Sequence, residues 1–175
     1  MSRFQDLVQR RRSHRKFTDE LVSDADVRCV LRAALMSPSS KSRRSWQFVV
    51  VRDTETISRL ASAKPSGSDF LRNVPVAIVV VGDSSDNDCW VEDCSIASVA
   101  MQYQAEDIGL GSCWVQLRGR GFEDGTTSDM VVRNLLGIPE GREVPCVIAL
   151  GHPSDERKPQ SEERLKWDNV HTERW

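Results

Sequence analysis

Long hydrophobic runs are missing from this sequence of 175 residues, whose longest apolar stretch is VAIVVV at Val76–Val81. A helix that crosses a bilayer needs roughly 20 apolar residues, so the sequence predicts no membrane span. No positively charged and then apolar leader opens the chain. We therefore expect a soluble, cytoplasmic protein with no membrane partner.

The chain also lacks an excess of positive charge. It carries 24 Lys and Arg against 26 Asp and Glu, a formal net charge of -2, and a sequence pI near 5.9. Proteins that bind nucleic acid or anionic membranes in general are usually basic, so we expect neither partner. The segment RRRSHRKF at Arg10–Phe17 is therefore a local concentration of cations that needs its own explanation.

Paired metal ligands and paired cysteines are absent too. The five cysteines include no C-x-x-C pair and lie in apolar segments, and the three histidines share no metal-ligand spacing with them. We expect reduced, mostly buried thiols and no metal site. The cysteines are Cys29, Cys89, Cys94, Cys113 and Cys146.

Common nucleotide and hydrolase motifs are missing as well. The sequence contains no G-x-x-x-x-G-K-[ST], no G-x-G-x-x-G after a strand and no G-x-S-x-G elbow. Glu92 and Asp93 are adjacent on a predicted helix and so point apart, which makes them poor partners for glycoside hydrolysis. We interpret them as a solvated face or a local cap.

What the sequence does contain is an alternation of helical and strand patterns, which predicts one layered domain around a sheet. Helices are predicted near Phe4–Val8, after Ser23 up to the SPSS segment at 37–40, at 54–62, at Trp90–Ile108, and at 127–137 with Gly137 closing it. Strands are predicted at 46–53, 74–83, 111–117 and 144–151, the first two as buried strands.

The residues from His152 to Trp175 are polar and charged apart from large apolar groups such as Trp167. Such a segment cannot form a core of its own. We expect it either to be disordered or to lie across another surface.

Three segments, taken together and in order, resemble the FMN-dependent nitroreductases. They are RRSHRKF at 11–17, SPSSKSRRSWQFVV at 37–50 and GLGSCWV at 109–115, and LLGIPEG, ALGHP and VHTERW follow in the expected order. The resemblance covers nearly the whole chain. It departs from the common family pattern at Ser42, Arg44 and Ser45, where Asn, Gln and Pro are usual, and in this it is similar to a branch of short family members.

The resemblance implies an α+β, three-layer fold with a central, mostly antiparallel sheet flanked by helices. Residues 1–175 would form a single FMN-binding domain. Its C-terminal extension, 152–175, would wrap the partner of a homodimer.

The resemblance also assigns roles within the cationic segment. Arg11 and Ser13 would bond the FMN phosphate, Arg12 would add contacts there, and Arg15 would face the pyrimidine edge of the flavin. A guanidinium suits both places because it is always charged and binds phosphate through two donors. A fixed cation at the pyrimidine edge favours the anionic reduced ring. Without the other motifs, a solvated basic turn at a helix end would be the simpler interpretation.

Further cofactor contacts are implied elsewhere. A loop would reach the flavin of the partner subunit, a strand would lie against the ring with its main chain, and two cations would meet the ring and the phosphate. These residues are Pro38, Ser39, Ser40, Lys41 and Ser42 in the loop, Cys113, Trp114, Val115 and Gln116 in the strand, and the cations Lys64 and Arg164, with Lys158 behind the latter. An ordinary surface position remains the alternative for each of the three lysine and arginine residues.

The resemblance implies an oxidoreductase that takes electrons from NADH or NADPH and passes them to a nitroaromatic, a quinone or a related acceptor by a ping-pong mechanism. That scheme needs no catalytic side chain. One alternative is a specialised reductase or dehalogenase of one metabolite, with the polar loop Arg118–Thr127 as substrate cover. Another is a non-catalytic flavin-binding module, or one that contacts nucleic acid through Arg10–Lys16.

Overall fold

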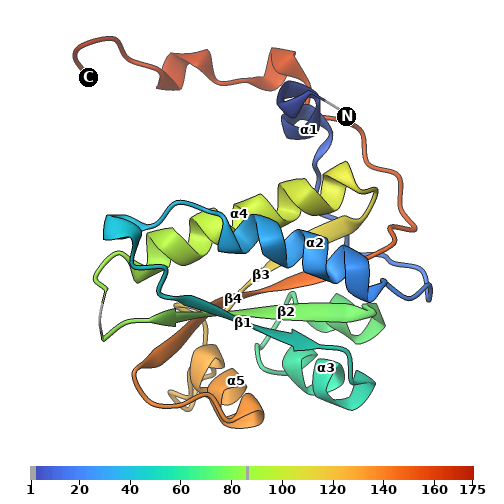
Figure 1. The fold of residues 1–175 in the computed structure, drawn as a ribbon, viewed down its shortest axis with the longest axis vertical. Helices are drawn as coiled ribbons and strands as arrows, with labels where there is room; N and C mark the ends of the chain where they lie inside the picture. The colour runs from blue at the N-terminus through green and yellow to red at the C-terminus, as the bar shows by residue number, and fades with distance from the viewer. Residues whose placement is uncertain (1–2, 86) are drawn as a thin grey trace.

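The computed structural model describes residues 3–85 and 87–175, and a four-stranded sheet lies at its centre (Figure 1). The strands lie in the order β1-β2-β4-β3 and have the bounds β1 (Trp46–Val51), β2 (Val76–Asp83), β3 (Gly111–Gln116) and β4 (Arg142–Gly151). All three neighbouring pairs are antiparallel, which confirms the predicted sheet.

Helices cover both faces of the sheet, so the molecule has the three predicted layers (Figure 1). One face is covered by α2 (Asp24–Leu35) and α4 (Trp90–Asp107), and the other by α3 (Thr54–Ala61) and α5 (Ser128–Leu136). The first helix, α1 (Phe4–Arg10), packs beside α4. Short 3₁₀ helices lie at η1 (Ser40–Ser42), η2 (Asp69–Asn73), η3 (Glu162–Arg164) and η4 (Trp167–Asn169).

The two central strands carry the hydrophobic core. Successive side chains of a strand point to opposite faces, so β2 contributes to both layers. Ile78 and Val80 pack with the α2 and α4 side, whereas Val79 and Val81 pack with the α3 and α5 side. Because both faces of β2 and β4 are covered, these strands are apolar along nearly their whole length.

The predicted strand at Trp46 is present, but the prediction that it is buried is wrong. β1 is an edge strand that pairs only with β2 among the described strands. Gln47 and Val50 are exposed, and Phe48 is half-buried. A short apolar run has the same sequence pattern in a central strand and in an edge strand, because the pattern of one segment does not show which strands lie beside it.

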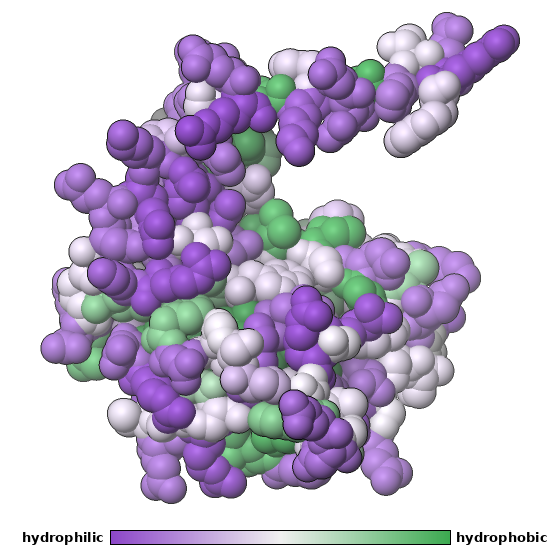
Figure 2. Space-filling model, turned by 180° about the vertical axis from the view of Figure 1, so that it is seen from behind, coloured by the Kyte–Doolittle hydropathy of each residue, from purple (hydrophilic) through white to green (hydrophobic). Residues whose placement is uncertain are grey.

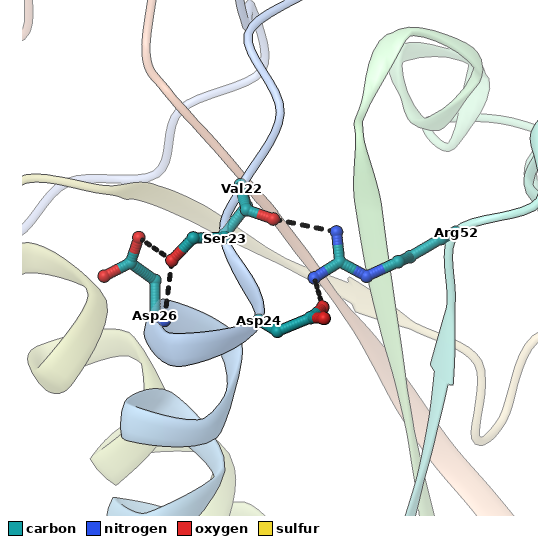
Figure 3. Close-up of polar contacts among 5 residues, drawn as sticks. All are labelled: Val22, Ser23, Asp24, Asp26 and Arg52. Atoms are coloured by element: carbon teal, nitrogen blue, oxygen red, sulfur yellow. Dashed lines mark hydrogen bonds and ion pairs between the residues drawn. The ribbon is translucent and has the colours of Figure 1, made fainter.

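Side-chain contacts fix the start of α2 against the end of β1 (Figure 3). The Ser23 hydroxyl accepts a hydrogen bond from the Asp26 N–H at 3.0 Å, as expected of an N-cap. Arg52, just after β1, donates to the Val22 carbonyl at 2.8 Å and to the Asp24 carboxylate at 2.9 Å. These bonds set where α2 begins over the sheet.

The C-terminal segment leaves the body of the molecule after β4 and extends beyond α1 (Figure 1). Every residue from 156 to 175 is exposed. Within residues 3–85 and 87–175, no helix has both the length and the apolar character that crossing a bilayer requires.

Candidate cofactor-binding site

After Arg10, which is the last residue of α1, the cationic segment runs in extended form beside the start of β3. Ser13 forms a parallel bridge with Ser112, and the His14 N–H donates to the Ser112 carbonyl at 3.0 Å. On its other side the segment meets the chain that follows β4, where the Ser154 N–H donates to the Lys16 carbonyl at 3.0 Å. Main-chain bonds on both sides therefore hold these cations at one edge of the sheet.

The even-numbered side chains of this segment make contacts within the molecule. Arg10 lies 3.9 Å from the Glu106 carboxylate near the end of α4. The Arg12 guanidinium donates to the main-chain carbonyl of Lys158. Arg12 is thus engaged with the C-terminal segment, a contact that the sequence pattern did not indicate.

His14 uses both its main chain and its side chain. It is buried, and its Nδ1 lies 2.8 Å from Asp155, whose other carboxylate oxygen lies 2.8 Å from Arg157. Burial alone would raise the pKa of the Asp155 carboxyl, but the hydrogen bond and charge of His14 and the charge of Arg157 lower it below its ordinary value. The contact ties the cationic segment to the C-terminal one.

The odd-numbered side chains face the opposite way, as expected of an extended segment with a period of two. Burial raises the pKa of the Cys113 thiol, while the charge of Arg15, a hydrogen bond with Ser13 and the charge of Arg11 each act to lower it. All three residues therefore lie near one buried thiol of β3. In the described part of the chain neither Arg11 nor Arg15 has an ion-pair partner, so this face carries positive charge that no carboxylate neutralises.

Arg157 is a further cation near this segment that we did not predict. Its charge also acts on the Cys113 thiol, but its guanidinium is paired with Asp155 and it lines a cavity together with Arg10 and His14. The sequence offered only a weak signal, a cation shortly after the last predicted strand. The predicted tail cation, Arg164, lies in the exposed η3, and its predicted contact with the phosphate stays a prediction.

β3 presents a free edge next to these cations. The Cys113 and Val115 side chains are buried in the core, whereas Trp114 and Gln116 are half-buried and linked by a hydrogen bond from Trp114 Nε1 of 2.9 Å. Because the Ser112 carbonyl points to His14, strand alternation directs the main-chain groups of Trp114 and Gln116 to the same edge. No described strand pairs with that edge, so these groups are available to a ligand.

The predicted loop residues Pro38, Ser39, Ser40, Lys41 and Ser42 run from a cavity beside α1, which Pro38 lines, to the start of α4, where Ser40 is bonded. Ser40 contacts Asp93 in the first turn of α4, whereas Arg10 contacts Glu106 near its last turn. Thirteen residues of helix separate the two places by about 20 Å. Within one chain, therefore, the loop and the cationic segment do not form one site.

Lys64 lies half-buried in the turn after α3, close to Gly67. In the part of the chain that the structure describes, its ammonium group makes no hydrogen bond or ion pair, and nothing links it to the cationic segment. Its predicted contact with the flavin ring stays a prediction.

Comparisons with known proteins agree with this architecture. The model of the Nitroreductase family matches residues 8–64 and 58–152. A provisionally named NADH dehydrogenase/NAD(P)H nitroreductase of Archaeoglobus fulgidus is 36% identical over 174 residues, which cover 97% of each chain. The structure of an FMN-dependent nitroreductase from Clostridium difficile R20291 is 39% identical, with a TM-score of 0.94 over 97% of this chain and 98% of that one.

Proposed function

The chain belongs to the nitroreductase family, and on that basis we propose that it is an FMN-dependent oxidoreductase that uses NADH or NADPH. The names of the two similar proteins from A. fulgidus and C. difficile support both the cofactor and the electron donor. We also propose that it works as a homodimer with the cofactor between the subunits.

The observation that carries the proposal is the positive face formed by Arg11, Ser13 and Arg15. Uncompensated guanidinium groups next to a hydroxyl form a donor set that fits a dianionic phosphate and the polar edge of a flavin. When bound, FMN would carry the electrons from the nicotinamide to an acceptor such as a nitroaromatic or a quinone, with the two substrates taking turns in a ping-pong scheme.

Within that site we assign the phosphate to Arg11 and Ser13 and the pyrimidine edge to Arg15. The main-chain groups of Trp114 and Gln116 at the free edge of β3 would bond the ring. Arg12 supports the site indirectly, since its guanidinium bonds the Lys158 carbonyl. The scheme assigns no side chain as acid or base.

Two features support a second subunit at the site. The Pro38–Ser42 loop lies too far from the cations of its own chain to join them, so it would complete the site of the partner. In addition, the C-terminal segment stands away from the body, and hydrophobic side chains gather along the hollow beneath it (Figure 2). Residues of α1, α4 and the C-terminal segment, among them Val8, Tyr103 and Leu165, line a cavity of about 340 Å³ there.

The proposal is tested by the colour of the purified protein. We expect a yellow protein whose flavin absorbance bleaches under anaerobic conditions when NADH or NADPH is added, and recovers with a quinone or nitroaromatic acceptor. Yellow protein that neither nicotinamide bleaches would favour a non-catalytic flavin-binding module. Protein that stays colourless after incubation with FMN would overturn the proposal.

A basic module that contacts nucleic acid through Arg10–Lys16 is less well supported. Arg10 is paired with Glu106 and Arg12 is bonded to a main-chain carbonyl, so the segment does not offer a continuous set of free cations.

A further inference from the structure

The loop between α2 and β1 is held in an unusual backbone conformation. Three of its residues have positive φ without being glycine: Lys41 at 49°, Ser42 at 54° and Arg44 at 53°. The left-handed region is unfavourable for residues with a Cβ, so three such residues within four positions need compensating contacts. Conformations of this kind persist where the surrounding structure determines them, and they are concentrated at functional sites.

The compensating contacts come from a buried carboxylate. Of the two adjacent acids in the first turn of α4, Glu92 is exposed and fits the solvated face, one of the two interpretations given for the pair. Asp93 is only 2% exposed, so that alternative is wrong for Asp93. One oxygen of Asp93 accepts the Ser40 N–H at 2.8 Å. The other accepts the side-chain amide of Asn87 at 2.7 Å.

Asn87 extends the same network to the end of the loop. It is 4% exposed, and its amide also donates to the Ser45 hydroxyl at 3.0 Å. The Ser45 carbonyl in turn accepts the Asp83 N–H of β2 at 3.2 Å. Within the loop, the Arg44 N–H donates to the Ser39 hydroxyl at 3.0 Å. Both ends of the left-handed segment are therefore fixed to α4 and β2.

Burying a carboxylate costs desolvation free energy, and an apolar side chain of similar size would often stabilise the fold as well or better. Asp93 lies where the α4 dipole favours an anion, which offsets part of that cost. Its charge also contributes, after burial, to raising the pKa of the neighbouring Cys94 thiol to about 12. One Asp93 oxygen bonds the loop directly, and the other bonds Asn87, which in turn bonds the loop. We therefore infer that the role of Asp93 is to hold the loop.

We propose that Asp93 is a positioning residue. Together with Asn87 it holds the Ser39–Ser45 loop in its observed conformation, with Lys41, Ser42 and Arg44 left-handed, and so presents Ser39, Ser40 and Lys41 preformed to the cofactor of the partner subunit. The cofactor part of this inference rests on the proposed function. The bonds that Asp93 and Asn87 make with this loop, which we call the clamp, can be tested without any cofactor.

The first experiment measures hydrogen–deuterium exchange of a peptide covering 37–46 in the full-length, FMN-free protein. Asp93→Asn keeps the shape of the side chain but leaves one acceptor for two donors. We expect this peptide to exchange about tenfold faster in the variant, whereas the matched neighbour Glu92→Gln exchanges like wild type. If Asp93→Asn does not fold, Ser45→Ala, which removes one bond of Asn87, is expected to give the same change. Unchanged exchange in the variant that folds overturns the clamp.

The second experiment measures FMN affinity and uses Arg44 to separate loop geometry from general stability. We expect Asp93→Asn to weaken FMN binding about tenfold. Adding Arg44→Gly should restore much of that loss because glycine adopts positive φ freely, whereas Arg44→Ala removes the same guanidinium without that freedom and should not. Equal rescue by both, or FMN binding by Asp93→Asn that matches wild type, overturns the positioning role. If the wild-type protein binds no FMN, the proposed function and the cofactor role of the loop are both overturned. The hydrogen–deuterium exchange experiment then still tests whether Asp93 and Asn87 hold the loop.

Discussion

At the scale of single residues, alternation along the cationic segment separates the side chains that we propose face the cofactor from those that contact the rest of the chain. Arg15 belongs to the first group. We expect Arg15→Ala to make the flavin harder to reduce, because a cation near the pyrimidine edge stabilises the reduced, anionic ring. The loss of about 1 kcal/mol corresponds to a potential about 20 mV more negative for a two-electron couple. The potential is measured by anaerobic titration against a reference dye, with Lys16→Ala as the control. A potential equal to that of wild type would contradict the role given to Arg15.

The FMN affinity of an Arg11 variant tests the same difference between the two faces of the cationic segment. We expect Arg11→Ala to weaken FMN binding about tenfold or more, because a charged hydrogen bond to phosphate is lost. The difference from wild type should shrink as salt is added, since salt screens the charge of Arg11. Arg10→Ala is the matched control, since Arg10 faces Glu106 and should leave the affinity nearly unchanged. Fluorescence titration with FMN measures both, and equal losses in the two variants would argue against the two-faced segment.

Residues of the site differ in how far the sequence alone could predict them. Arg11, Ser13 and Arg15 lie in one short motif, so their proximity follows from local geometry. The pairing of His14 with Asp155 spans 141 positions, and that of Ser40 with Asp93 spans 53. Such contacts depend on how the layers pack, and no local pattern encodes them.

At the scale of elements, the sequence predicts the helices and strands well where a local signal marks their ends. Thr127 caps α5 through a hydrogen bond from the Met130 N–H at 3.2 Å, and Gly137 closes it with a φ of 64°. The burial of β1 was beyond prediction because its valines resemble those of β2. Strand order decides which of the two is covered on both faces, and strand order is a property of the whole sheet.

The contact of the cationic segment with the C-terminal one gives a pH-dependent prediction. Folding lowers the pKa of Asp155, so this carboxylate stabilises the fold above its ordinary pKa near 3.8, and the contribution disappears as pH falls through the lower folded value. We expect Asp155→Asn to lose about 1 kcal/mol of unfolding free energy at pH 7, and we expect this difference from wild type to shrink at a pH below 3.8. Urea unfolding at the two pH values measures this. The neighbouring exposed acid gives the control Glu156→Gln, which should match wild type at both.

At the scale of the whole molecule, the C-terminal segment projects as an arm with exposed apolar side chains (Figure 1), and we propose that a partner subunit covers them. Trp167 is 70% exposed, Val170 is 64% exposed, and Trp175 is fully exposed in a segment that makes no core. Isolated apolar side chains are common on surfaces, but a projecting arm that carries several of them is typical of an interaction surface. The arm begins beside the cations of the candidate site, so a partner that covers the arm would also approach that site.

Removing residues 161–175 tests this arrangement while keeping the bond of 2.8 Å from the Gln160 N–H to the Gln9 carbonyl. We expect the shortened protein to dimerise roughly tenfold or more weakly, because large aromatic anchors supply much of the energy of an interface. FMN retention should fall with it, while the thermal unfolding of the body changes little, since the deleted residues are exposed. Sedimentation velocity measures the association, and Met130→Ser, on the opposite face in α5, serves as the control. A shortened protein that dimerises and keeps FMN like wild type would show that the arm does not hold the second subunit.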